Sequence, residues 1–156
     1  MSDLQRQELL DQLFSVGRSH SDVAVLLFDS LARQMGLSAS DAKALGVLER
    51  SGPLGAGELA EQIGLSAASV TTLVDRLEKK DFVERTRDPD DRRRVIIAAR
   101  PEKLEEAQTI FAPLFVSVQK LFERYSEQEL ETILDFLTQD RARMRKLLEE
   151  FRNSER

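Results

Sequence analysis

Residues 66–80 read SAASVTTLVDRLEKK, and the rest of the chain is interpreted outward from them. Four apolar side chains recur here at the i, i+3, i+4, i+7 spacing that places them on one face of an α-helix: Val70, Leu73, Val74 and Leu77. Ser66 is a residue type that caps helix N-termini. The stretch therefore predicts a helix over about 66–80, with one buried face and an outward face rich in hydroxyl and charged groups.

A shorter helix is predicted just before this one, over about 57–63. Its apolar residues are Leu59, Ala60 and Ile63. Gly64 is suited to end it, because glycine accepts the left-handed backbone found at helix C-termini. Two short helices separated by a two-residue turn form a helix-turn-helix.

Residues upstream of this pair predict a further helix and a connector. Ser38 and Asp41 have the spacing of a capping box, which predicts a helix from there to about Arg50. Residues 51–55 read SGPLG and are interpreted as a turn-rich connector.

Downstream of Lys80 the pattern changes from helix to strand. Residues 82–87 and 94–98 predict two paired strands, and the Asp- and Pro-rich residues 88–91 between them favour a turn. A helix-turn-helix followed by a β-hairpin is a winged helix. The predicted fold class is therefore mainly α with a small β-hairpin wing at about 82–98.

Long helices are predicted on both sides of the winged helix. Apolar residues at three- and four-residue steps predict one over about 9–35, ended by Gly36, and another over 104–125, kinked at Pro113. Ser126 and Glu129 form a capping box that starts a last helix. These apolar faces exceed what a small winged helix needs, so we expect residues 1–36 and 101–156 to dimerise around the winged-helix domain at 37–100. A monomeric bundle, with the flanks folded onto the winged helix, is the alternative.

Composition excludes several classes of function. The chain has 156 residues, no cysteine, and His20 as its one histidine. It therefore has no disulfide framework, thiol switch or Cys-type zinc site, and no metal or cofactor is expected. A catalytic triad would have to be built on His20, which makes an enzyme the weakest interpretation. No apolar run is long enough for a signal peptide or a membrane span, so a cytoplasmic protein without a membrane partner is expected.

Charge is distributed unevenly along the chain. The net charge is −5, yet residues 66–100 hold nine basic and seven acidic side chains and are net positive. From Arg92 to Arg100 there is no acidic residue, which suits phosphates or a narrow minor groove. A solvated arginine run balanced by the wing aspartates is the alternative.

Three segments in this order and spacing resemble the MarR family of bacterial transcriptional regulators. They are GELAEQIGLS at 57–66, SVTTLVDRLEKK at 69–80 and RTRDPDDRRR at 85–94. The resemblance extends to the flanks, since that family places its winged helix between dimerisation helices. It implies an obligate homodimer on a pseudo-palindromic double-stranded DNA operator, usually a repressor released by a small aromatic or phenolic ligand.

By this resemblance the helix over about 66–80 is the recognition helix, and the chain departs from the family pattern after that helix and after the wing. Asp81 stands where the family usually has glycine, and aspartate tolerates a left-handed backbone better than most residues. Residues 98–103, AARPEK, replace the family's usual Leu-Thr and following Gly, and Pro101 can still start a helix. Neither change is expected to prevent the fold.

A recognition helix enters the major groove with its N-terminal residues toward the bases. The residues expected to face DNA from the helix are Ser66, Ala67, Ala68, Ser69, Thr71, Thr72 and Arg76. Only Arg76 is a long base-reading side chain, so direct readout should be modest; a salt bridge to Asp75 or Glu78, or a phosphate contact, is its alternative role.

The wing is expected to supply the other DNA contacts. By resemblance, Asp91 orients Arg93, which enters the minor groove, while Arg92 and Arg94 lie near phosphates. Alternate strand residues point to opposite faces, so spacing does not settle which arginine enters.

The resemblance also implies an effector cleft between the dimerisation helices and the winged helix. Phe14, Arg18, His20 and Leu45 are the candidates from their helix positions. A packed or interface histidine with a satisfied hydrogen bond is the alternative for His20. Because a fold does not fix a function, a winged-helix module that binds proteins without specific DNA binding is the alternative to a regulator.

Overall fold

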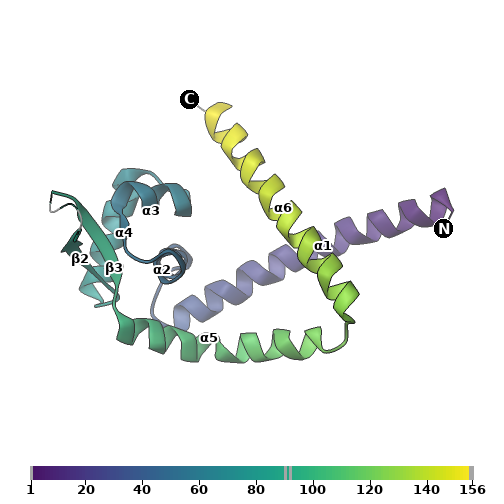
Figure 1. Cartoon of the computed structure of the whole chain (residues 1–156), viewed down its shortest axis with the longest axis horizontal. Coiled ribbons are helices and arrows are strands. Elements are labelled where there is room, and N and C mark those ends of the chain that lie inside the picture. Colours follow the sequence, from purple (N-terminus) through teal and green to yellow (C-terminus); the bar gives the residue numbers. More distant parts are fainter. Residues whose placement is uncertain (1, 90, 92, 155–156) are drawn as a thin grey trace. The chain divides into compact units, whose positions relative to one another are not determined.

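The computed structural model describes residues 2–89, 91 and 93–154 (Figure 1). In chain order its elements are α1 (Asp3–Gln34), α2 (Ala39–Ser51), β1 (Leu54–Gly55), α3 (Ala56–Ile63), α4 (Ala67–Lys79), β2 (Val83–Arg87), β3 (Val95–Ala99), α5 (Pro101–Phe122) and α6 (Glu127–Ser154). The chain divides into two compact units, residues 1–111 and 112–156, with the division inside α5. The mainly helical fold class with a small wing is confirmed; the three-part division into domains stays a prediction.

The helix ends in the first unit are fixed by local signals that the sequence carries. The hydroxyl of Ser38 accepts a hydrogen bond from the Asp41 N–H at 3.2 Å, and the Asp41 carboxylate accepts one from the Ser38 N–H at 3.2 Å. Ser66 caps α4 in the same way, by accepting from the Ser69 N–H. Gly64 ends α3 with a left-handed φ of 81°. The predicted capping box and caps are confirmed.

The sheet has three antiparallel strands in the order β1-β3-β2. The predicted hairpin is present, with Val83 opposite Ala99 and Arg87 opposite Val95. The interpretation of residues 51–55 as a connector was incomplete, because Leu54 and Gly55 pair with Ile97 and Ile96 as β1. A two-residue strand has no periodicity of its own and is defined by the backbone groups of its partner strand.

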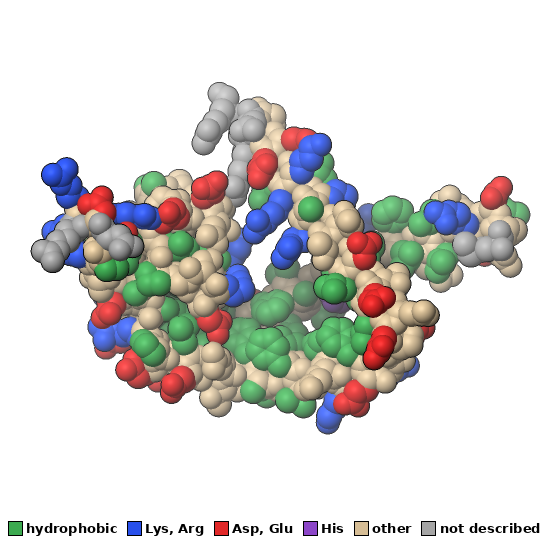
Figure 2. Space-filling model, in the orientation of Figure 1, with side chains coloured by type: hydrophobic (Ala, Val, Ile, Leu, Met, Phe, Trp, Pro, Cys, Tyr) green, Lys and Arg blue, Asp and Glu red, His purple; other side chains and the backbone are tan. Residues whose placement is uncertain are grey.

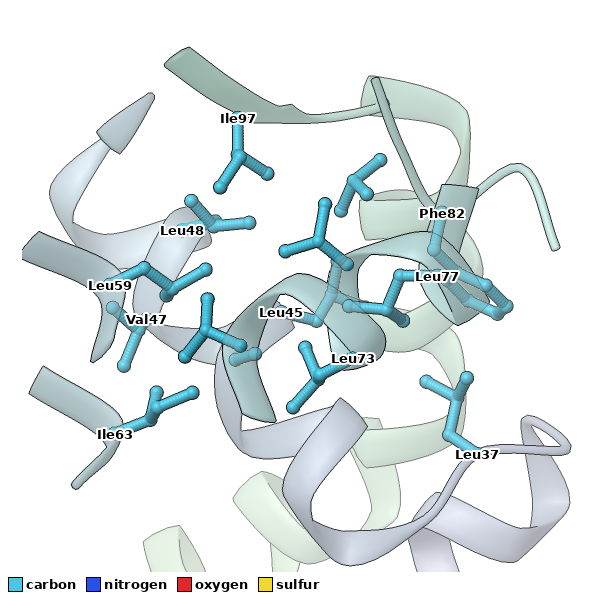
Figure 3. Close-up of a cluster of buried hydrophobic side chains, with 14 of the residues drawn as sticks. Leu37, Leu45, Val47, Leu48, Leu59, Ile63, Leu73, Leu77, Phe82 and Ile97 are labelled. Carbon is cyan, nitrogen blue, oxygen red and sulfur yellow. The ribbon is translucent and has the colours of Figure 1, made fainter. Parts of the chain in front are cut away.

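The core of the first unit lies between α2, α3, α4 and the sheet (Figure 3). The inner face predicted for α4 is confirmed, since Val70, Leu73, Val74 and Leu77 are at most 1% exposed. Residues from α1, α2, α3, β2, β3 and the loops before α2 and β2 complete this cluster, including Leu37, Leu45, Leu48, Leu59, Ile63, Phe82 and Ile97. Packing on one face thus leaves the other faces of α4 turned to solvent.

Asp81 lies in the turn between α4 and β2 with a φ of 63°. An L-residue in this left-handed conformation is strained by about 1–2 kcal/mol, less for aspartate than for most others. Its side chain is exposed, and its ion pair with Arg100 at 3.6 Å contributes little. The departure from glycine is therefore tolerated, at a cost in stability.

Replacing Asp81 with glycine is expected to raise the free energy of unfolding by about 1 kcal/mol, because glycine adopts this φ without strain. Urea titration of the parent and the variant measures the change. Asp81→Ala is the control, since it removes the same charge but keeps the Cβ. An equal gain in the alanine variant would assign the effect to charge and contradict strain.

The flanking helices carry large apolar side chains exposed to solvent. On α1 these include Leu9, Leu13, Phe14, Val16, Val23, Val25, Leu26 and Phe28. In the second unit they include Phe115, Leu121, Phe122, Leu134, Phe136, Leu137, Met144, Leu148 and Phe151.

α5 continues as one helix through Pro113, where the sequence predicts a kink, and the predicted capping box at Ser126 and Glu129 is present. None of the helices in the described part of the chain is long and apolar enough to cross a membrane.

Candidate nucleic-acid interface

The outward face at the start of α4 carries only small side chains, four of which have hydroxyl groups. Ser66, Ala67, Ala68, Ser69, Thr71 and Thr72 are all exposed. The two threonine hydroxyls donate to the carbonyls of Ala67 and Ala68 at 3.1 and 3.3 Å, and each hydroxyl oxygen can still accept a hydrogen bond. The first turn of α4 has no acidic residue. The partial positive charge of this helix end is therefore not neutralised locally, which favours a nearby anion such as a phosphate.

Arg76 extends from the same helix and is held by a residue of α2. Its Nη2 lies 2.6 Å from Oδ1 of Asp41, whose side chain is 3% exposed, while the Arg76 side chain is 46% exposed. The sequence suggested Asp75 or Glu78 as ion-pair partners for Arg76, and this was wrong. Both of those residues pair instead with Arg85 of β2, so they tie the wing to α4.

Asp41 is buried and charged, so its protonation affects stability. Burial raises the pKa of Asp41, but hydrogen bonds from Arg76 and Ser38 lower it by more, and the result lies below the ordinary value of 3.8. A carboxyl whose pKa is depressed in the folded chain stabilises the fold above its ordinary pKa. That contribution is lost as the pH falls through the folded pKa.

Asp41→Asn is expected to lower the free energy of unfolding at neutral pH by about 1–3 kcal/mol, the range for hydrogen bonds to charged groups. The difference from the parent should shrink as the pH is lowered beyond the ordinary carboxyl value of 3.8. Denaturant unfolding of both proteins over that pH range measures it. A difference that stays constant with pH would show that the carboxylate charge is not its source.

The two wing arginines predicted to contact DNA that the structure describes, Arg93 and Arg94, differ in whether they are paired. Oδ1 of Asp91 accepts a hydrogen bond from the backbone N–H of Arg93 at 3.0 Å, which fixes the turn that carries Arg93. The Arg93 side chain is exposed and forms no ion pair with any described residue. Figure 2 shows basic and acidic side chains together around the hairpin tip. Arg92, also a candidate, lies outside the described residues.

The Arg94 side chain forms ion pairs with two carboxylates of the chain itself. Its Nη2 bonds the Glu58 carboxylate of α3, and its Nη1 lies 3.7 Å from Asp88. The same Glu58 oxygen accepts from the Gly55 N–H at 2.8 Å, and this bond and Arg94 lower the pKa of Glu58. Arg94 therefore joins β3 to the start of α3, a role that sequence reasoning missed because Glu58 is 36 residues away.

The four candidate effector residues are not brought together within one chain. Phe14, Arg18 and His20 are exposed on α1, whereas Leu45 is 3% exposed in the core with Ala32. At 1.5 Å per residue, Phe14 lies about 27 Å along α1 from Ala32. Among the residues that the structure describes, no group of three or more His, Asp or Glu side chains could hold a metal ion.

Comparison with known proteins identifies the family. Residues 37–95 match the MarR family. The chain is 40% identical over 132 residues to YcgE, an HTH-type transcriptional regulator of Bacillus subtilis, covering 85% of this chain and 86% of that protein. The chain belongs to the MarR family of transcriptional regulators.

Solved MarR structures share the fold. A MarR family protein from Bacillus stearothermophilus superposes with a TM-score of 0.68 at 21% identity, over 92% of this chain and 98% of that one. A variant of MepR from Staphylococcus aureus, bound to an oligodeoxyribonucleotide, superposes with a TM-score of 0.58 at 21% identity, over 83% and 96% of the two chains. The winged helix predicted from the sequence is therefore confirmed as a MarR fold.

Proposed function

We propose that this MarR family chain binds double-stranded DNA as a homodimer and represses transcription from a pseudo-palindromic operator. In this proposal α4 enters the major groove, the Arg93 side chain enters the minor groove, and the protein acts in the cytoplasm without catalysing a reaction. A variant of MepR, which shares the fold, is bound to an oligodeoxyribonucleotide in its solved structure, and this supports DNA binding by the present chain.

The observation that carries the proposal is the contrast among the basic side chains of α4 and the wing. Arg76, Arg85 and Arg94 are engaged by carboxylates of the chain itself. Arg93 is exposed at the hairpin, on a turn fixed by Asp91, with no ion pair to a described residue. An exposed arginine side chain that has no ion-pair partner in its own chain can bind DNA phosphates or enter the minor groove.

The exposed apolar face of α1 supports the homodimer. A row of large apolar side chains along a helix is covered by partner surface in most proteins. Two copies related by a twofold axis would bury such a face and set two recognition helices one DNA turn apart, which matches a palindromic site. The aromatic or phenolic effector stays a prediction that rests on the resemblance.

Selection of bound fragments from the source genome at near-physiological salt tests the proposal. The parent chain should enrich an inverted repeat, and transcription from a template carrying it should fall when the protein is added. Arg93→Ala should weaken binding to that repeat about tenfold, and reduce the magnitude of the slope of log affinity against log salt by about two, as expected for one lost contact in each of the two protomers. Arg50→Ala, an exposed arginine of α2 outside α4 and the wing, changes the net charge equally and is the control.

Two results would contradict the proposal. If the parent enriches no fragment above non-specific background, the chain is a winged-helix interaction module rather than an operator-binding regulator. If Arg93→Ala and Arg50→Ala weaken binding equally, net charge is responsible and the wing assignment fails.

A further inference from the structure

Asp41 is the one charged residue that the structure buries among those it describes. We propose that Asp41 is a positioning residue for DNA recognition: from α2, it fixes the guanidinium of Arg76 on α4 in the orientation that contacts the operator. This inference rests on the proposed function and deepens it, because it adds a residue that affects DNA affinity without touching DNA.

Both oxygens of the Asp41 carboxylate accept hydrogen bonds, one on each side. Oδ1 binds Nη2 of Arg76 at 2.6 Å, and Oδ2 accepts from the Ser38 N–H at 3.2 Å. The Asp41 N–H in turn donates to the Ser38 hydroxyl. The backbone N–H of Ser38 therefore holds the carboxylate, and with it one end of the Arg76 side chain, while the Ser38 hydroxyl holds the Asp41 backbone.

Arg76 keeps capacity for a second partner while it is bound. A guanidinium has five N–H donors in a planar fork, and its contact with Asp41 engages Nη2. The side chain is still 46% exposed. A long side chain already fixed at one donor loses less conformational freedom when its other donors bind a base or phosphate.

The position of Arg76 on α4 directs it to the DNA-facing side. Ser69, Thr72 and Arg76 follow each other at i, i+3 and i+7, so they share one face of the helix. This face is distinct from the buried face that ends at Leu77. Arg76 therefore extends the row of exposed hydroxyls proposed to lie in the groove, and Asp41 lies behind it.

A double-mutant cycle on DNA affinity tests the proposal, with the duplex enriched by the parent chain and a scrambled duplex of equal length as probes. Asp41→Asn and Arg76→Ala should each weaken binding to the enriched duplex about tenfold and lower its preference over the scrambled one. In the Arg76→Ala background, Asp41→Asn should have less than a twofold further effect. A pair that acts as one unit shows this non-additivity.

Two further variants separate positioning from stability. Ser38→Ala removes the hydroxyl of the capping box but leaves the Asp41 carboxylate and its contact with Arg76, so it should lower stability while changing affinity less than twofold. Arg76→Lys keeps a charge beside Asp41 and is expected to fold. It lacks the planar fork, so its affinity for the enriched duplex should still fall about fivefold.

Three outcomes would overturn the inference. The first is that Arg76→Lys binds the enriched duplex like the parent. The second is that Asp41→Asn weakens binding equally with and without Arg76, and the third is that Ser38→Ala weakens it as much as Asp41→Asn does. In these cases the parent still selects its operator, so the proposed function stands. If the parent enriches no duplex at all, the proposed function and the inference fail together.

Discussion

Replacing Leu77 with alanine is expected to lower the free energy of unfolding by about 3–4 kcal/mol, within the range for fully buried leucines. Leu77 is 0% exposed and lies on the inner face of α4, near Phe82 in the core (Figure 3). The truncation removes buried methyl groups and leaves a cavity that the surrounding helices fill only in part. Urea unfolding at one fixed protein concentration measures the loss.

Leu65→Ala is the matched control for this prediction. Leu65 precedes α4 by two residues and is 38% exposed, so the same truncation removes less buried surface and leaves no enclosed cavity. Its cost should stay below about 1 kcal/mol. Equal losses in the two variants would mean that the inner face of α4 does not carry the stability assigned to it.

The parts of the fold that could be predicted are those specified by nearby residues. The inner face of α4 follows from apolar spacing over eight residues, and the capping box of α2 from Ser38 and Asp41, which are three residues apart. The left-handed turn at Asp81 could be expected from its residue type, and its φ of 63° confirms this. In each case the cause of the structure lies within about two helical turns or one β-turn.

The parts that could not be predicted are pairings between distant residues. Arg76 meets Asp41 across 35 positions, and Arg94 meets Glu58 across 36. The chain has 23 basic and 28 acidic side chains, so residue type leaves many partners open for each arginine. β1 was missed for the same reason, because its two residues are defined by β3.

These ion pairs between distant residues reduce the number of arginines that can contact DNA. The sequence shows a run of arginines in the wing, and its spacing does not settle which of them enters the minor groove. The structure separates Arg94, which holds β3 against α3, from Arg93, whose side chain is exposed. Carboxylates of the chain itself therefore pair with some of the arginines in residues 66–100. Fewer arginines can bind DNA phosphates than the number of basic residues in this stretch suggests.

We expect the second large effect on the formation of the proposed homodimer. Leu13→Asp should raise the dissociation constant of the proposed homodimer about 100-fold or more, because an unpaired carboxylate in an apolar interface costs several kcal/mol and each 1.4 kcal/mol is about tenfold. Leu13 is 60% exposed on the apolar face of α1 in the single chain. A twofold axis places the substitution in the interface twice. Sedimentation over a range of concentrations measures the change.

Ser15→Asp is the control that separates charge from position. Residue 15 is two positions along α1 from residue 13, which is about 200° around the helix, so the same charge lies on the opposite face. It should leave the dissociation constant within about threefold, since surface substitutions away from such features have small effects. If both variants dissociate alike, charge on α1 is responsible. If neither dissociates, the apolar face of α1 is not the dimer interface, and two recognition helices spaced for one operator would need another origin.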